Sequence, residues 1–376
     1  SIQPNVPEIH SNLGDAFKES NRLEEAIQVY LQAIEIKPNI AQVHASIGFV
    51  FYQKLVELDD VLDGSNTQND NSEFHGKVSD SLKVTSYLEK VIQYYQQAIE
   101  INPVYSADVC NNLGVAYAKM KRFEEAIQQY NKAIGIDAQY DEAYSNLGQA
   151  LHEQKRLEEA ISAYQKAIDI GSECTEYHRG YGDSLLLTGN WKQGWKEYEW
   201  RWKNDKFLAR NERIFPHLTW DGSSLDNTSI LVWLEQGVGD QIMFASLLPK
   251  LQQQAEETFV EIEYRLYPIF RRSFHNIRFL IARTQPRPQL LDESIGYQSP
   301  IGSLAQWLLP DEESFPKYHA YLKACQTKTK KFRKKYQQLA NGKLLIGISW
   351  KSTKANNDFG KLKSTSLIQW TSLLNQ

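Results

Sequence analysis

The chain has 376 residues, of which 41% are hydrophobic and 23% are charged, and its formal net charge is −4. These values are typical of a globular protein of two or three domains, and they exclude the basic surface of a general nucleic-acid-binding protein. No stretch approaches the roughly 20 apolar residues of a membrane-spanning helix, so we expect no membrane span and no nucleic-acid partner. The three cysteines lie far apart and indicate neither a disulfide framework nor a zinc site, which favours a cytoplasmic location.

The first half of the chain repeats one pattern about every 34 residues. Each copy contains a glycine that follows Leu or Tyr, and a tyrosine later in the copy. The glycine pairs are Leu13-Gly14, Leu113-Gly114, Leu147-Gly148 and Tyr181-Gly182. Because two antiparallel helices cannot bury their apolar faces alone, this period predicts helical hairpins stacked into a solenoid. The pattern resembles the tetratricopeptide repeat, which implies a repeat domain over residues 1–203 that binds a protein or peptide.

The second copy is interrupted. His44 and Gly48 belong to its first helix, but the residues typical of its second helix begin only at Val91. The stretch between them is polar and lacks apolar periodicity, so we expect residues 57–84 to form a disordered insert. It is either a tolerated surface insertion or a loop for regulation or a partner.

Asparagine recurs at one position of the repeat, directly before the Leu-Gly pair, as Asn12, Asn112 and Asn146. In tetratricopeptide superhelices the first helices line the concave groove, so these amides are candidates for binding an extended peptide backbone. They resemble the asparagine ladder of the O-linked N-acetylglucosamine transferases. The alternative is that asparagine is simply tolerated on a polar helix surface.

A tryptophan-rich segment follows the repeats. Trp191, Trp195, Tyr198 and Trp202 lie at helical spacing and form one aromatic stripe. We expect this stripe to be buried and to join the last repeat to the next domain.

From Ser229 onward, apolar strand patterns alternate with helical ones. Strands are predicted at 229–234, 259–264, 279–282 and 344–350, and the run from 241 to 254 predicts a helix. This alternation indicates a doubly wound α/β lobe over residues 204–342. Residues 343–376 would begin a second lobe that the chain does not complete.

A glycine loop follows the first of these strands. Gly237 and Gly239 would let the backbone approach a ligand, but the dinucleotide-binding fingerprint fails because Ile242 stands at its third glycine. Asp240, at the end of the loop, is a candidate general base that takes a proton from an acceptor hydroxyl. Its alternative role is to cap the following helix.

Several motifs occur together in one order. They are the Trp-rich segment, Trp220-Asp-Gly, Glu235-Gln-Gly-Val-Gly-Asp-Gln-Ile-Met-Phe, Ser299-Pro-Ile-Gly-Ser-Leu and Ile346-Gly-Ile-Ser-Trp. This combination resembles bacterial tetratricopeptide proteins with a C-terminal, two-lobed (GT-B-like) glycosyltransferase region of the heptosyltransferase kind. The resemblance implies that Asp240 is the base. It also implies that Lys351, Lys361, Lys363 and Ser364 bind the donor diphosphate, although the lysines are equally compatible with ordinary loop residues.

The expected function is therefore a peptide-binding repeat domain fused to a glycosyltransferase-like domain. In the full-length parent it would transfer sugar from a nucleotide-sugar donor to a protein or glycan acceptor, without a further cofactor and without a metal. The alternative is a non-catalytic scaffold with a degenerate α/β lobe. Pro4 lies 34 residues before Pro38, and the last strand and helix cannot form a core, so the sequence is expected to be cut at both ends and inactive by itself.

Overall fold

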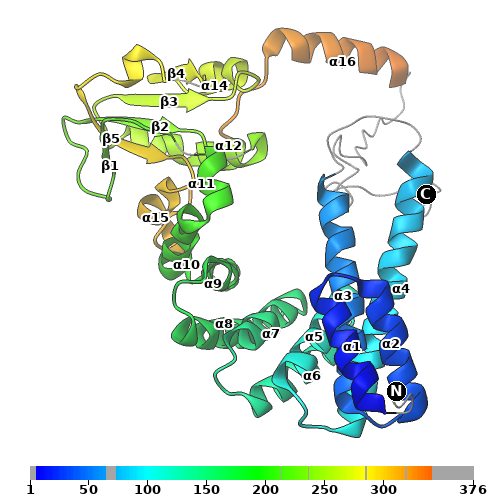
Figure 1. The fold of residues 1–376 in the computed structure, drawn as a ribbon. Helices are drawn as coiled ribbons and strands as arrows, with labels where there is room; N and C mark the ends of the chain where they lie inside the picture. The colour runs from blue at the N-terminus through cyan, green and yellow to red at the C-terminus, as the bar shows by residue number, and fades with distance from the viewer. Residues whose placement is uncertain are drawn as a thin grey trace. The chain divides into compact units, whose positions relative to one another are not determined.

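The computed structural model describes residues 6–64, 73–211, 213–235, 237–283, 286–317 and 320–340. It divides into two units, of which the first contains residues 1–264 and 276–317 and the second contains 265–275 and 318–376. In the first unit, paired helices are followed by a parallel sheet (Figure 1). The predicted strand at 344–350, and the sites at Lys351, Lys361, Lys363 and Ser364, lie outside the described residues.

Helices α1 to α10 form five antiparallel hairpins. The pairs are α1 (Pro7–Glu19) with α2 (Leu23–Ile36), α3 (Ala41–Gly64) with α4 (Glu73–Ile101), α5 (Ala107–Lys119) with α6 (Phe123–Ile136), α7 (Asp141–Glu153) with α8 (Leu157–Ile170), and α9 (Thr175–Leu187) with α10 (Trp191–Tyr198). The four hairpins whose turns the structure describes each turn through a residue in the left-handed region, as at Lys155 (φ 62°) and Gly189 (φ 82°). The predicted solenoid of hairpins is confirmed.

The glycine and tyrosine of each repeat pack against each other. In the first four hairpins, a Cβ atom added to the glycine would lie 2.5–3.0 Å from the buried tyrosine ring of the second helix. The pairs are Gly14 with Tyr30, Gly48 with Tyr95, Gly114 with Tyr130, and Gly148 with Tyr164. The glycine is therefore the residue that lets the two helices approach closely enough to bury the ring.

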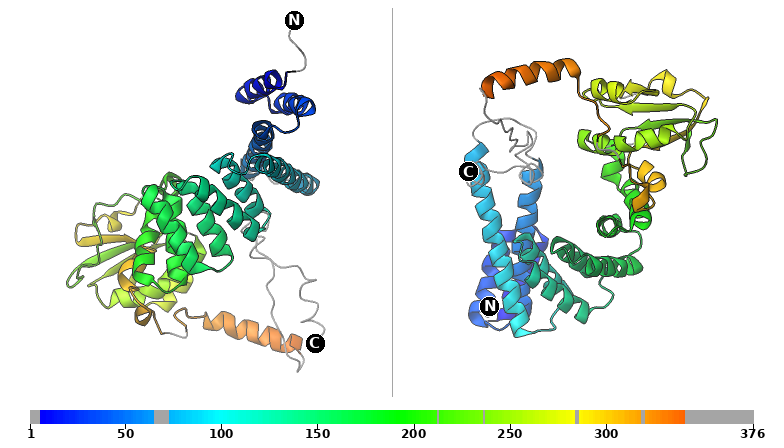
Figure 2. Two further views of the ribbon diagram at one scale, coloured as in Figure 1. Left: turned by 90° about the horizontal axis from the view of Figure 1, so that it is seen from below. Right: turned by 180° about the vertical axis from the view of Figure 1, so that it is seen from behind.

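The insert of the second repeat differs from its prediction. Helix α3 continues to Gly64 and α4 begins at Glu73, so parts of 57–84 that were expected to be disordered are helical. Figure 2 shows the two long helices running side by side. Extending an existing helix costs far less than nucleating one, so a hairpin can lengthen outward without its own apolar periodicity. Residues 65–72 lie outside the described residues.

The aromatic stripe after the repeats joins the last repeat to the next part of the chain as predicted, but its four side chains are half-buried and not fully buried. Helix α10 is followed by the 3-10 helix η2 (Glu199–Lys203) and by α11 (Asp205–Asn211). The Trp195 ring lies 6.3 Å from that of Phe244, and the Trp202 ring lies 5.5 Å from that of Trp233. These contacts pack the last hairpin against the α/β part.

Five strands form one wholly parallel sheet in the order β1-β5-β2-β3-β4. They are β1 (Leu218–Thr219), β2 (Ser229–Trp233), β3 (Thr258–Ile262), β4 (Ile277–Ile281) and β5 (Ile295–Pro300). The chain moves from β2 outward to β4 and then returns to place β5 on the other side of β2. The direction of winding therefore reverses between β2 and β5, and the crevice at the carboxyl ends of these two strands is where ligands bind in open α/β sheets.

The connecting helices are short. They are α12 (Val238–Phe244), η3 (Ala245–Leu247), α13 (Leu248–Gln252), η4 (Pro288–Leu290), α15 (Leu304–Leu308) and η5 (Glu312–Ser314). The single helix predicted over 241–254 is thus three segments, with Pro249 in the first turn of α13. Three of the predicted strands are present, as β2, β3 and β4, whereas β1 and β5 were not predicted.

The second unit contains α14 (Tyr267–Ser273) and α16 (Gln326–Ala340). Within it, the backbone N–H of Lys323 donates to Ser273 Oγ at 2.8 Å. Because the predicted second lobe lies outside the described residues, a parallel α/β sheet is what the structure establishes for this half of the chain.

Candidate functional site

Two places in the first unit combine a cavity with positioned polar side chains. The first is a pocket of about 510 Å³ on helices α7 to α9. Asn146 lines it and donates from Nδ2 to Oδ1 of Asn111 at 3.0 Å. Asn111 is fully buried, and its own Nδ2 lies 3.4 Å from the Tyr140 hydroxyl and 3.5 Å from Glu142 Oε1. A chain of amides therefore holds Asn146 in place at the pocket wall.

The three predicted groove asparagines are not equivalent. Asn146 lines this pocket, but Asn12 is exposed on α1, Asn112 is half-buried on α5, and neither lines it. The functional partner that the sequence reasoning missed is Asn111, which lies one residue outside the repeat register. The doublet Asn111-Asn112 was the available signal.

The same pocket is acidic. Four carboxylate side chains line it, against one arginine, Arg179, and one histidine, His152; the carboxylates are Glu142, Glu153, Glu176 and Asp183. Its floor includes Gly180, where a Cβ atom would lie 2.3 Å from the Tyr164 ring. The pocket therefore favours a ligand that carries positive charge.

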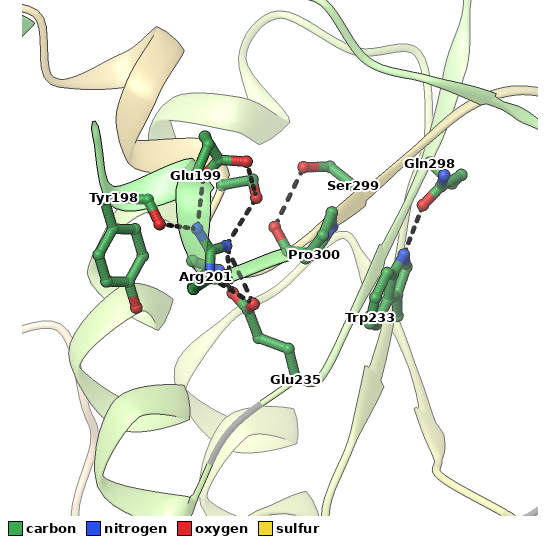
Figure 3. A network of polar contacts seen from close by, with 10 residues as sticks. Tyr198, Glu199, Arg201, Trp233, Glu235, Gln298, Ser299 and Pro300 are labelled. Carbon is green, nitrogen blue, oxygen red and sulfur yellow. Dashed lines mark hydrogen bonds and ion pairs between the residues drawn. The ribbon is translucent and has the colours of Figure 1, made fainter. Parts of the chain in front are cut away.

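The second place lies at the crevice between β2 and β5 (Figure 3). Arg201, on η2, forms a two-pronged ion pair with Glu235, the second residue after β2, with N···O distances of 3.0 Å on both prongs. The Arg201 side chain is 8% exposed and that of Glu235 is 0% exposed. The backbone N–H of Gly302, just after β5, also donates to Glu235 Oε1 at 2.6 Å. The ion pair thus connects η2 with the ends of both strands.

All five N–H groups of Arg201 have an acceptor. Besides its bonds to Glu235, it donates to the Tyr198 carbonyl at 2.9 Å, to Glu199 Oε1 at 2.6 Å and to Ser303 Oγ at 2.8 Å. Ser303 Oγ in turn donates to Glu199 Oε2 at 2.8 Å. Burial opposes the charge of Arg201, but the carboxylates of Glu235 and Glu199 outweigh burial, so the pKa of the guanidinium is raised. This arginine is fully engaged inside the protein.

Two of the sequence motifs each contain a glycine that allows close packing at or beside the Arg201–Glu235 ion pair. A Cβ atom at Gly302 would lie 2.2 Å from Glu235 Oε1, so the Ser-Pro-Ile-Gly-Ser motif needs its glycine. Gly222, of the Trp-Asp-Gly motif, has a φ of 85°, and a Cβ there would lie 2.4 Å from the Trp307 ring. The glycine makes the turn and also lets Trp307 pack on the backbone. Beside the ion pair lies a cavity of about 470 Å³.

The predicted catalytic loop is more open than the surroundings of this ion pair. Gly237 is the N-cap of α12, so Asp240 is the third residue of the helix and the alternative of an N-cap role for it is wrong. Gly237 and Gly239 are exposed, and a Cβ at Gly239 would meet no atom within 4 Å. The space before Asp240 is therefore accessible, and its role as a base stays a prediction.

The described part of the chain contains neither a metal-ion cluster nor a helix suited to crossing a membrane. Within the described residues, no group of three or more His, Cys, Asp or Glu side chains is arranged to hold a metal ion. None of the helices in these ranges is both long and apolar enough to cross a membrane. The predictions of metal-free chemistry and of a cytoplasmic location remain predictions.

Comparison with known families identifies the hairpins. Residues 14–54 and 117–155 match a family model described as TPR repeat, and residues 141–174 match one described as Tetratricopeptide repeat. The hairpins that these models cover are tetratricopeptide repeats. These matches all lie in the repeat part of the chain, so the glycosyltransferase-like resemblance of the α/β part stays a prediction.

Among curated proteins, the chain is similar to Protein FlbA of Caulobacter vibrioides, with 29% identity over 184 residues. The match covers 46% of this chain and only 30% of that protein. Among solved structures, MamA has 17% identity and a TM-score of 0.42, covering 55% of this chain and 96% of that one. YrrB, described as a TPR protein with an unusual peptide-binding site, has 14% identity and a TM-score of 0.43, covering 54% and 87%.

Proposed function

We propose that the tetratricopeptide repeats bind an extended, positively charged peptide segment in the pocket on α7 to α9. The observation that carries this proposal is the hydrogen bond between the buried Asn111 and the half-buried Asn146 at the pocket wall. Asn146 uses one N–H to bond Asn111, so its carbonyl oxygen and second N–H can meet a peptide group. Because the pair is fixed before binding, little side-chain entropy is lost when a peptide docks.

The charges of the pocket support a basic partner. Its four carboxylates exceed its cationic groups, and Arg179 already lies 3.9 Å from Asp183. A Lys or Arg side chain of a peptide would therefore find ionised acceptors without displacing a strong internal ion pair. An acidic peptide would meet repulsion from the same groups.

The test is binding of the intact chain to an array of immobilised 12-residue peptides that differ in net charge. We expect selection of basic peptides, and a loss of about five- to tenfold in affinity for Asn146→Ala, which is the cost of roughly one hydrogen bond. Asn12→Ala is the matched control, because it removes the asparagine at the same repeat position from an exposed site on α1. Equal binding by both variants, or a preference for acidic peptides, would contradict the proposal.

We also propose, as a second function, sugar transfer by the α/β part of the full-length protein. The supporting observation is that two motifs meet at the crevice between β2 and β5, with the accessible Asp240 in the first turn of α12. Asp240 would take the proton of an acceptor hydroxyl as its oxygen attacks the anomeric carbon and the bond to the donor diphosphate breaks. Lys351, Lys361, Lys363 and Ser364 would bind the diphosphate leaving group.

This function is tested by incubating the full-length protein with nucleotide-diphosphate sugars and measuring release of the nucleotide diphosphate. We expect Asp240→Asn to lower the rate by about 10²- to 10⁴-fold, and the exposed Glu256→Gln to leave it unchanged. If the parent neither binds nor hydrolyses any donor, the non-catalytic scaffold is the correct reading, and the peptide proposal is unaffected.

A further inference from the structure

The cavity of about 470 Å³ beside the crevice is lined by four tryptophans, which are Trp202, Trp220, Trp233 and Trp307. It lies where β1, β2 and β5 end, since Trp220 follows β1, Trp233 ends β2 and Pro300 ends β5. Its volume falls within the range of about 300–1,000 Å³ that is typical of small-molecule sites. Neither the peptide pocket nor Asp240 contributes to its lining.

Two of the tryptophans, Trp220 and Trp233, are held in fixed positions by hydrogen bonds. Trp233 Nε1 donates to Oε1 of Gln298 (Figure 3), and Gln298 Nε2 donates to Thr219 Oγ1 at 2.9 Å. Trp220 Nε1 donates to the Ser223 carbonyl at 2.9 Å. Both of these indoles are 4% exposed, whereas Trp307 is 38% exposed. The cavity therefore has a rigid aromatic wall with open ring surface at Trp307.

The two charged side chains of the lining, Glu199 and Asp221, are carboxylates and therefore hydrogen-bond acceptors. Glu199 is fixed by Arg201 and Ser303, and Asp221 accepts from the Ser223 backbone N–H at 3.0 Å. The Asp221 carboxylate accepts hydrogen bonds from the Ser223 hydroxyl and from the Ser223 backbone N–H, and these bonds hold the pKa of Asp221 below its usual value. The amide of Gln306 also lines the cavity. A complementary ligand must therefore supply hydroxyl or N–H donors.

An anionic ligand fits this lining poorly. No Lys or Arg is among the residues that line the cavity, and the nearby Arg201 has committed all five of its N–H groups internally. A phosphate would meet the Asp221 carboxylate, while the Arg201 charge is already balanced by Glu199 and Glu235. The ligand of this cavity is therefore not the phosphate group that often occupies such a crevice.

A cation or a flat aromatic ring also fits less well than a neutral polyol. The Arg201 guanidinium already lies 5.1 Å from the centre of the Trp202 ring, which repels a second cation there. The Trp202 and Trp233 rings are inclined by 61°, so they do not form a parallel slot for a planar base. A sugar ring has an apolar C–H face for an indole and several hydroxyl donors for carboxylates.

We propose that this tryptophan cavity is a binding site for a neutral sugar ring, such as a pyranose unit of a glycan. The C–H face of the ring would lie on the exposed face of Trp307, and its hydroxyl groups would donate to Asp221. This inference rests on neither proposed function, because a non-catalytic scaffold can bind a glycan equally well.

The experiment titrates the intact chain with neutral methyl glycosides and short neutral oligosaccharides, and in parallel with uridine, choline and inorganic phosphate, by tryptophan fluorescence and ligand-observed NMR. We expect at least one neutral glycoside to bind, with a Kd on the order of 1 mM or below. Asp221→Asn should weaken this binding at least about fivefold, because an ionised acceptor is replaced by a neutral one.

The matched control is Asp292→Asn. Asp292 accepts from the Ser294 backbone N–H at 2.9 Å in the same i to i+2 arrangement, but it does not line the cavity. The Asp292→Asn variant should bind the glycoside as tightly as the unchanged protein does. Both Asp variants should keep the melting temperature of the unchanged protein. Trp307→Phe, which retains a ring on Gly222, should weaken binding as well. The proposal is overturned if no neutral glycoside binds, if uridine, choline or phosphate binds instead, or if the two Asp variants bind alike.

Discussion

Replacing Gly114 with alanine tests the packing rule on which the repeat depends. The new Cβ atom would lie 2.5 Å from Cε1 of Tyr130, whereas ordinary contact begins at 3.4 Å. Tyr130 is 2% exposed and cannot swing into solvent. Overpacking of this kind costs about 1–3 kcal/mol, and the better helix propensity of alanine returns about 1 kcal/mol at most. We expect a net loss of up to about 2 kcal/mol in the free energy of unfolding.

Gly135→Ala is the matched control. Gly135 lies in α6, the partner helix of the same hairpin, and a Cβ there would meet no atom within 4 Å. Only the propensity gain then remains, so this variant should be more stable by up to about 1 kcal/mol. The same chemical change should thus move stability in opposite directions at two positions of one hairpin.

The assay is urea unfolding followed by circular dichroism at 222 nm, for both variants and for the double variant Gly114→Ala/Tyr130→Leu. Tyr130→Leu alone should destabilise because it leaves a cavity. In the double variant, the loss in the free energy of unfolding should be smaller than the sum of the losses in the two single variants. The leucine side chain is smaller than tyrosine and leaves space for the new methyl group. A Gly114→Ala variant as stable as Gly135→Ala, or strictly additive losses, would refute the packing argument.

Three further predictions concern the turns, the buried ion pair and the tyrosines. Lys155→Gly should raise the thermal midpoint, and Gly189→Ala should lower it, because both positions are left-handed (φ 62° and 82°) and a side chain there costs about 1 kcal/mol. Arg201→Met should destabilise by about 3–5 kcal/mol at pH 7, since it leaves the Glu235 carboxylate buried and unpaired. Burial raises the pKa of Glu235, so the deficit should shrink as the pH is lowered and this carboxylate takes up a proton; a deficit that does not change with pH would show that the charge is not the cause. Burial raises the pKa of the repeat tyrosines, including Tyr130, so stability should be constant below pH 10 and fall above it as unfolded tyrosines ionise. Tyr130→Phe should reduce this slope, as measured by urea unfolding between pH 8 and 11.

Local sequence was sufficient for the elements whose signal is periodic. The spacing of the glycines and tyrosines predicted the hairpins, because each pair meets within a single hairpin. The apolar run at 229–234 predicted β2 for the same reason, since burial on both faces requires such a run. Strand β1 was not predicted because a strand of two residues shows no periodicity. The helices in the insert were not predicted because an existing helix can be extended without apolar periodicity.

The candidate sites were predictable only in part. Asn146 was found because it obeys the repeat register, and its partner Asn111 was missed because it does not. Asp240 was singled out from its place after a strand, and the structure adds that it is accessible. The buried ion pair of Glu235 was not predicted. Nothing in the local sequence around a loop glutamate indicates that it will pair with an arginine 34 residues earlier.

The sequence by itself determined that this protein has tetratricopeptide hairpins followed by alternating strands and helices, since hairpins and single strands are indicated by periodic patterns of residues near one another in the chain. The tertiary structure decided what the separate motifs do. Arg201 and Ser303 lie 102 residues apart and meet only because the chain reverses its winding between β2 and β5. That reversal brings the ends of three strands together and places four tryptophans around one cavity. No local sequence pattern predicts these contacts, because they depend on the strand order of the whole sheet.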